Sequence, residues 1–131
     1  MLIGLLLSMP NPNSRKILFL LRHPPYSSNR PMETIESIIV AGIFEQSVTV
    51  LFKDDGVWQV IDKQDGSLNG GKTISKVLGA LGEYGINELY VCEESLGARG
   101  LSMNDLRKDV KLLSNLAQQK LLANQEVVLN D

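Results

Sequence analysis

The chain alternates short, continuous apolar runs with segments whose apolar residues recur at helical spacing. The clearest runs are Lys16–Leu21, Ser47–Phe52 and Glu88–Cys92, which have strand length and are rich in Ile, Leu, Val and Phe. Because they lack a regular apolar–polar alternation, they predict strands that are covered on both faces. Strands that alternate with helices favour a parallel sheet with helices on both sides. The sequence therefore predicts an α/β domain of three layers with a mainly parallel sheet.

Three segments between and after these runs show helical patterns. Pro31 suits a first helical turn, and an apolar stripe follows it. Ser102 and Asp105 form a pair with the spacing of a helix cap. The predicted helices cover residues 32–44, 73–81 and 106–121, and a last short strand covers residues 127–129. The segment 57–61 stays open between an extended and a helical conformation.

The predicted connections place the functional loops at one edge of the sheet. Right-handed crossovers bring all carboxyl ends of parallel strands to the same edge, where open α/β sheets bind ligands. Residues 22–31, 53–56 and 93–102 follow those ends. We expect one domain, residues 15–131, after a flexible N-terminal extension of residues 1–14, because the sequence PNPN breaks the extension from the first strand.

Composition argues against several classes of function. The 131 residues carry a net charge of −2, so no overall basic field exists to hold nucleic acid directly. One Cys and one His are too few for a disulfide framework or a zinc site, and we predict no metal and no cofactor. The N-terminal apolar run is too short to cross a membrane and lacks the features of a secretory signal. A cytoplasmic protein without membrane association is expected.

Residues 66–73, GSLNGGKT, match the pattern of a phosphate-binding loop. Such a loop leaves a buried strand directly, whereas the polar residues 62–65 stand before this one. An Asp that would hold magnesium at the end of a later strand is also missing. We interpret the segment as a glycine-rich surface loop that leads into a helix. A small nucleotide-binding protein that uses residues 66–73 is the alternative from another functional class.

Cys92 stands at the predicted carboxyl end of a strand, in the segment VCEESLGARGL. A thiol at this edge could carry a persulfide, since sulfur transfer needs a thiolate that attacks and is later relieved of its sulfur. A lone Cys in a strand is more often a small buried side chain. Glu93 and Glu94 follow it, and their negative charges disfavour a thiolate.

Three segments in chain order resemble the DsrE/DsrF-type sulfur-relay family, and most of all its DsrF/TusC branch. They are KILFLL with a following PPY loop, VLFKDDGVWQ, and VCEESLGARGL, and the resemblance spans residues 16–101. It implies a five-stranded domain with flavodoxin-like layering. It also implies a cytoplasmic complex that passes persulfide sulfur between proteins, for tRNA 2-thiouridine synthesis or intracellular sulfur oxidation. The implied partners are homologous DsrE/TusD-like and DsrH/TusB-like subunits in a heterohexamer, and a downstream sulfur-acceptor protein.

The resemblance also bears on the role of Cys92. In that family the sulfur-carrying cysteine belongs to the DsrE/TusD-like subunit, at the position that matches Cys92, and small uncharged residues follow it. Here Glu93 and Glu94 follow instead. The implied role is a mainly architectural subunit and not an independent enzyme. A persulfide carrier that uses Cys92 is the alternative, and homo-oligomers of this chain alone stay open.

Polar residues in the predicted edge loops are further candidates. Arg99 could hold an anionic sulfur group or a partner's carboxylate, or be a solvated loop charge. Asp54 and Asp55 could serve as acid–base groups. Because glycine follows them, we interpret them as turn formers instead. His23 could act as a general base, but no second catalytic group is placed beside it, so a loop residue is the simpler interpretation.

Two aromatic residues are candidates for contacts with other subunits. Trp58 and Tyr26 could anchor an interface, because aromatic side chains are enriched where subunits bury surface. They fit the core of the domain equally well, so both interpretations stay open.

Overall fold

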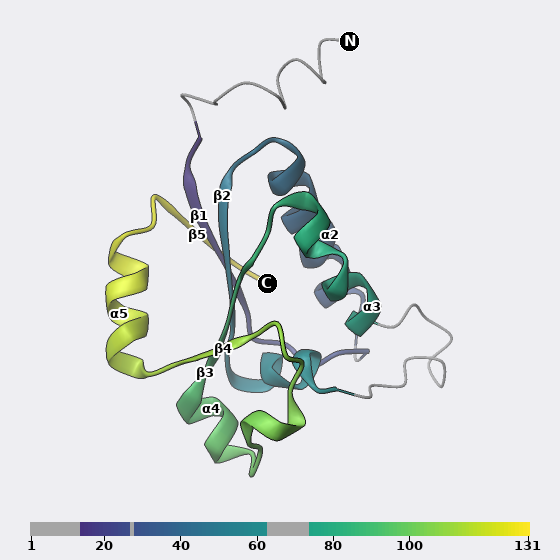
Figure 1. Ribbon diagram of the computed structural model, residues 1–131, viewed down its shortest axis with the longest axis vertical. Helices are drawn as coiled ribbons and strands as arrows, with labels where there is room; N and C mark the ends of the chain where they lie inside the picture. The colour runs from purple at the N-terminus through teal and green to yellow at the C-terminus, as the bar shows by residue number, and fades with distance from the viewer. Residues whose placement is uncertain (1–13, 27, 63–73) are drawn as a thin grey trace.

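The computed structural model describes residues 14–26, 28–62 and 74–131. Its centre is a five-stranded sheet in the order β4-β3-β2-β1-β5, and every pair of neighbouring strands is parallel (Figure 1). The strands are β1 (Lys16–Leu21), β2 (Ser47–Phe52), β3 (Glu88–Cys92), β4 (Lys111–Leu113) and β5 (Val127–Asn130). The predicted α/β fold is confirmed.

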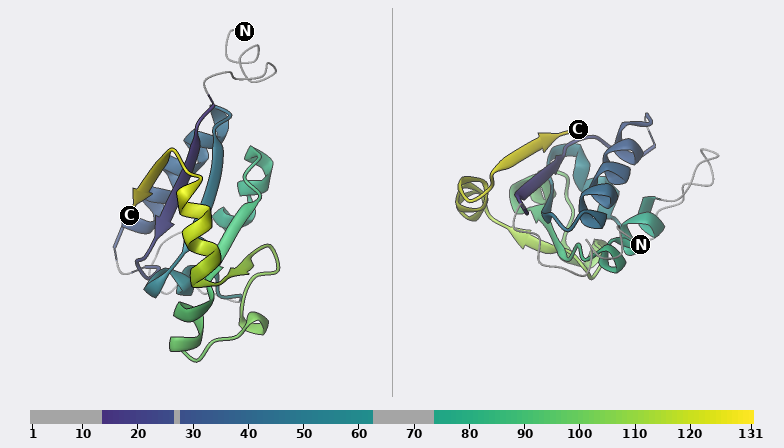
Figure 2. Two further views of the ribbon diagram at one scale, coloured as in Figure 1. Left: turned by 90° about the vertical axis from the view of Figure 1, so that its left-hand side faces the viewer. Right: turned by 90° about the horizontal axis from the view of Figure 1, so that it is seen from above.

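Helices lie on both faces of the sheet. On one face lie α2 (Arg30–Ile43) and α3 (Ile74–Gly79), the latter followed by the 3₁₀ helix η3 (Leu81–Tyr84). The other face carries α5 (Asn115–Ala123), as the two turned views show (Figure 2). The short α4 (Glu93–Ala98) covers neither face and lies beyond the carboxyl end of β3 (Figure 1).

The larger hydrophobic cluster lies on one face of the sheet. Alternate strand residues that point towards α2 and α3 form the main core, with Phe19, Val50 and Leu89 in adjacent strands all nearly inaccessible. This follows from the period of two in a strand, which sends neighbouring residues to opposite faces. On the other face Leu18 and Leu51 are also buried, but they stand outside this cluster, and Gln118 is the one buried residue of α5 itself. The main core therefore lies on the α2 side.

One predicted element is wrong. The sequence pattern predicts a helix over residues 106–121, but residues 111–113 form the edge strand β4, and a helix begins only at Asn115. Tertiary contacts hold the earlier part extended: Leu106 bridges Ile61, and the Arg107 N–H donates to the carbonyl of Val60 at 3.0 Å. The apolar spacing that suggested a helix instead places Leu106 and Val110 in the core.

Other expectations differ in detail. Ser102 and Asp105 do form a capping box, but it caps the three-residue η4 (Met103–Asp105). The open segment is the 3₁₀ helix η1 (Asp54–Val60). Most of the predicted extension 1–14 and the glycine-rich segment 66–73 lie outside the described residues. In the described part of the chain, no helix combines the length and apolar character that crossing a membrane requires.

Candidate functional site

The carboxyl ends of β1, β2 and β3 bring the predicted site residues to one edge of the sheet. Arg22 and His23 follow β1, Asp54 and Asp55 begin η1 after β2, and Cys92 ends β3. In Figure 1 this edge is the end of the molecule where α4 lies. The structure therefore has these residues at the carboxyl edge of the sheet, as right-handed crossovers between parallel strands predict.

Cys92 is a buried residue that caps a helix. It is 1% exposed, and its Sγ accepts a hydrogen bond from the Ser95 N–H at 3.4 Å, the position of an N-cap for α4. The thiol in turn donates to Oε2 of Glu94 at 3.6 Å. Both hydrogen-bonding functions of the sulfur are therefore used inside the domain, and the thiol faces little solvent.

Glu94 connects the start of α4 with the start of α5. Its Oε1 accepts the Asn115 N–H, at the start of α5, at 3.1 Å. This hydrogen bond is the largest cause that lowers the pKa of Glu94 below the usual range of a glutamate. The backbone N–H of Glu94 itself lowers this pKa further, and the Cys92 thiol and the charge of Lys53 each contribute less than the opposing effect of desolvation. The Glu94 carboxylate thus stays ionised beside the Cys92 thiol and accepts a hydrogen bond from it.

The segment DDGVWQ packs its backbone against the end of β1. Gly56 is buried, and a Cβ atom placed on it would stand 1.9 Å from the carbonyl oxygen of Leu21. Only glycine allows this approach. Asp54 has a φ of 51°, and its N–H donates to Oγ of Ser95 at 2.9 Å, which joins η1 to α4.

Two arginines bind the paired aspartates. Arg99 donates from Nε to Oδ1 of Asp55 at 3.1 Å and from Nη1 to the carbonyl oxygen of Ser95 at 3.0 Å. Arg22 donates from Nε to Oδ2 of Asp54 at 2.7 Å. Each aspartate therefore forms an ion pair with an arginine from another part of the chain. The guanidinium of Arg99 is thus bound within the domain. These contacts agree with turn-forming and bracing roles.

His23 lies next to a residue that the sequence did not single out. Its Nδ1 is 2.9 Å from Oδ1 of Asp131, whose side chain is completely buried, and its Nε2 is 3.3 Å from Nη1 of Arg30. Because Arg30 can only donate, Nε2 accepts and the ring proton sits on Nδ1. Asp131 follows β5, far away in sequence, so no local pattern could have revealed this contact.

The two candidate aromatic residues differ in their surroundings. Tyr26 is partly buried against the core, and its hydroxyl accepts the Ile74 N–H, at the start of α3, at 3.0 Å. Trp58 lies on η1 and keeps 38% of its surface exposed. Tyr26 thus has a structural contact within the domain, whereas Trp58 offers apolar surface to solvent.

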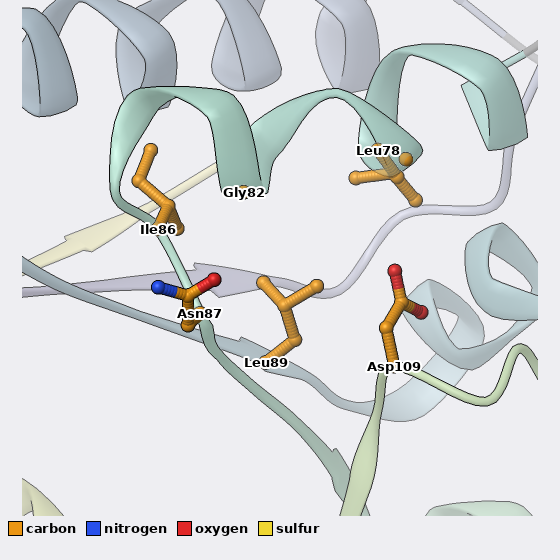
Figure 3. A pocket seen from close by; sticks show the side chains of 7 residues that line it. Leu78, Gly82, Ile86, Asn87, Leu89 and Asp109 are labelled. Atoms are coloured by element: carbon orange, nitrogen blue, oxygen red, sulfur yellow. The ribbon is translucent and has the colours of Figure 1, made fainter.

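No metal-binding cluster adjoins Cys92 in the described part of the chain. Among the described residues no group of three or more His, Cys, Asp or Glu side chains is placed to hold a metal. A hollow of about 240 Å³ lies between the α3–η3 segment and β3. Figure 3 shows Leu89 and Asp109 pointing into it. Asp109 is held there by two hydrogen bonds from Arg107, both of 3.0 Å.

Comparison with known sequences gives a consistent result. The DsrE/DsrF-like family matches residues 15–130. The intracellular sulfur oxidation protein DsrF of Allochromatium vinosum is 39% identical over 92 residues, which are 70% of this chain and 68% of that protein. A TusC homologue of Pseudomonas aeruginosa is 31% identical over 116 residues, 88% of this chain and 98% of that protein. A TusC homologue of Vibrio parahaemolyticus is 32% identical over 99 residues, 76% and 84% of the two chains.

Comparison with solved structures supports the fold. The crystal structure of the ychN protein from E. coli superposes with a TM-score of 0.79, covering 89% of this chain and 99% of that one. Its sequence identity is 18%, so the likeness concerns the architecture alone.

Proposed function

The chain belongs to the DsrE/DsrF-like family, with relatives in its DsrF/TusC branch, and on this premise we propose that it is a DsrF/TusC-like subunit of a cytoplasmic sulfur-relay complex. In this proposal the complex passes persulfide sulfur between proteins, for tRNA 2-thiouridine synthesis or intracellular sulfur oxidation. This chain contributes mainly architecture. Its partners are homologous DsrE/TusD-like and DsrH/TusB-like subunits and a downstream sulfur acceptor.

The burial of Cys92 is the observation that carries the architectural role. A persulfide carrier must present its sulfur to a donor and then to an acceptor, each of them a protein. Cys92 instead is 1% exposed and caps α4 through the Ser95 N–H. The thiol is thus used to hold α4 at the end of β3.

Residues 91–101, one of the segments that carry the family resemblance, also connect two elements at this edge; we call these contacts of α4 with η1 the brace. Ser95 accepts the Asp54 N–H, and Arg99 binds both Asp55 and the carbonyl oxygen of Ser95. These contacts join α4 to η1 across the carboxyl ends of β2 and β3. A rigid edge of this kind suits a subunit that positions neighbours.

The alternative function, a persulfide carrier that uses Cys92, has one favourable observation. Oε2 of Glu94 accepts the thiol proton in a hydrogen bond, so a proton acceptor stands beside the sulfur. In such a transfer the Cys92 thiolate attacks the outer sulfur of the donor persulfide. A sulfur–sulfur bond forms at Cys92 and the donor leaves as a thiolate.

Intact-mass spectrometry distinguishes the two roles. The folded chain is incubated with a persulfide-charged cysteine desulfurase, with Cys92→Ser as the matched control, since Cys92 is the only cysteine. The architectural role predicts no mass gain by either protein. A gain of one sulfur atom by the wild type that disappears in Cys92→Ser refutes the architectural role and establishes the carrier.

A second experiment tests membership of a complex. The chain is co-expressed with DsrE/TusD-like and DsrH/TusB-like subunits from one genome, and the purified material is weighed by native mass spectrometry. The proposal predicts one particle that contains all three kinds of subunit. Separate elution of this chain would contradict it.

A further inference from the structure

A shallow groove lies at the edge of the sheet opposite to Cys92. It occupies about 600 Å³ between the end of α2 and η3, and its lining includes Ile43, Glu45, Glu83 and Tyr84. The chain passes from this end of α2 directly into the start of β2, so the groove belongs to the amino-terminal edge of the sheet. In Figure 1 the end of α2 and the start of β3 lie at one end of the molecule and α4 at the other.

Gly42, which lines the groove, lets α2 approach η3 closely. A Cβ atom on Gly42 would stand 2.8 Å from the carbonyl oxygen of Tyr84 and 2.9 Å from Cδ1 of Ile86, so α2 packs closely there against the end of η3. Apolar side chains rise around this contact. Ile43 is 36% and Tyr84 39% exposed, and the neighbouring Phe44 is 60% exposed. Exposed apolar side chains grouped in this way are typical of a binding surface.

Glu45 stands where a helix end normally has glycine. The Gln46 N–H donates to the carbonyl of Ala41 and the Glu45 N–H to that of Gly42, the pattern of a Schellman motif that ends α2. The residue between these bonds takes a positive φ, 57° for Glu45. A side chain is disfavoured in this conformation, so glycine would suit the fold better. An observed outlier of this kind points to a use for the carboxylate itself.

The two charged residues that line the groove are both acidic. Glu45 and Glu83 line it, and neither forms an ion pair with another described residue. The last turn of α2 carries no basic residue to offset the negative end of the helix dipole. The groove therefore combines apolar surface with two carboxylates that have no ion-pair partner in the described part of the chain, an arrangement complementary to a cation next to an apolar group.

We propose that this groove binds a segment of a partner protein in which an apolar side chain stands beside Lys or Arg. The apolar side chain covers Ile43 and Tyr84, and the cation lies between Glu45 and Glu83. Because the groove is at the edge opposite to Cys92, a partner held there leaves the carboxyl ends of the strands accessible.

The test follows the NMR signals of the ¹⁵N-labelled full chain while a peptide is added. The probe is acetyl-Gly-Lys-Leu-Lys-Gly-amide, and two control peptides replace both lysines by Glu or the leucine by Ser. We expect saturable shifts at Ile43 and Tyr84 with the probe alone. Glu45→Lys should weaken binding about fivefold, as expected when an exposed opposite-charge contact becomes repulsive. Glu36→Lys, an exposed charge reversal earlier on α2, should leave binding unchanged.

A further variant separates the carboxylate from the fold. Glu45→Gly is expected to keep or raise the melting temperature and still to weaken peptide binding, because it removes the charge and suits the positive φ. Unchanged peptide affinity in this variant would overturn the proposal, as would the absence of saturable shifts in the groove.

Groove signals that broaden with protein concentration alone would assign the surface to a second copy of this chain. If the groove signals shift in the Leu5→Asp variant but not on addition of peptide, the groove binds the chain's own N-terminal residues. Self-association and binding of the N-terminal residues would each overturn the proposal.

Discussion

Replacing Gly56 by alanine should strongly destabilise this protein. The added Cβ would stand 1.9 Å from the carbonyl oxygen and 2.6 Å from the carbonyl carbon of Leu21. Both are backbone atoms at the end of β1, and that oxygen also accepts the Lys53 N–H at 3.0 Å. Relief of the clash must therefore separate η1 from the central strand. We expect a loss of about 3 kcal/mol, the upper part of the usual range for overpacking.

Gly97→Ala is the matched control for this substitution. Gly97 lies near the end of α4 and is exposed, and a Cβ added there would meet no atom within 4 Å. Alanine at this position should stabilise the protein by about 0.5 kcal/mol, because it restricts the unfolded chain and favours helix. Urea unfolding followed by circular dichroism measures both changes, and Gly56→Ala should also lower the melting temperature by roughly 10 °C. A loss below about 1 kcal/mol for Gly56→Ala would refute the reasoning, since overpacking costs more.

Three further predictions concern the brace around α4. A double-mutant cycle with Arg99→Ala and Asp55→Ala should give a coupling free energy of about 0.5 kcal/mol in urea unfolding, because the pair is partly exposed; zero coupling would show that the contact does not brace η1. Cys92→Ala should cost about 1 kcal/mol more than Cys92→Ser, which keeps a cap acceptor for α4, and equal stabilities of the two variants would argue against the cap. Because the folded pKa of Glu94 is lowered, its stabilising effect is present above the unfolded pKa and is lost as the pH falls through the folded value. The stability difference between wild type and Glu94→Gln should therefore be largest near neutral pH and shrink below about pH 4, and a difference that persists at lower pH would contradict this.

Local sequence patterns were sufficient for most of the sheet. The strands at residues 16–21, 47–52 and 88–92 were predicted with the bounds that the structure has, because each is a continuous apolar run. The helix predicted over 32–44 is α2, which begins at Arg30, two residues earlier. The same patterns failed at residues 111–113. Three residues are too short to show a period, and pairing with β3 decides their conformation.

The candidate site was predictable in its location and only partly in its chemistry. The topology rule placed Cys92 at the carboxyl edge, and the charges of Glu93 and Glu94 already argued against a thiolate. Local sequence could not show that Ser95 and Glu94 would satisfy the sulfur, since that depends on how α4 turns after β3. The contact of His23 with Asp131 joins residues 108 positions apart.

The sequence by itself determined the class of fold, the edge where polar side chains gather and the family to which the chain is related. These properties follow from apolar runs, helical spacing and short motifs, all of which act over a few residues. Tertiary structure alone decided that Cys92 is a buried cap, that Arg99 is bound to Asp55 and that Glu45 borders a groove. Each of these depends on contacts between elements distant in the chain, because burial and ion pairing are set by what the other elements place beside a residue.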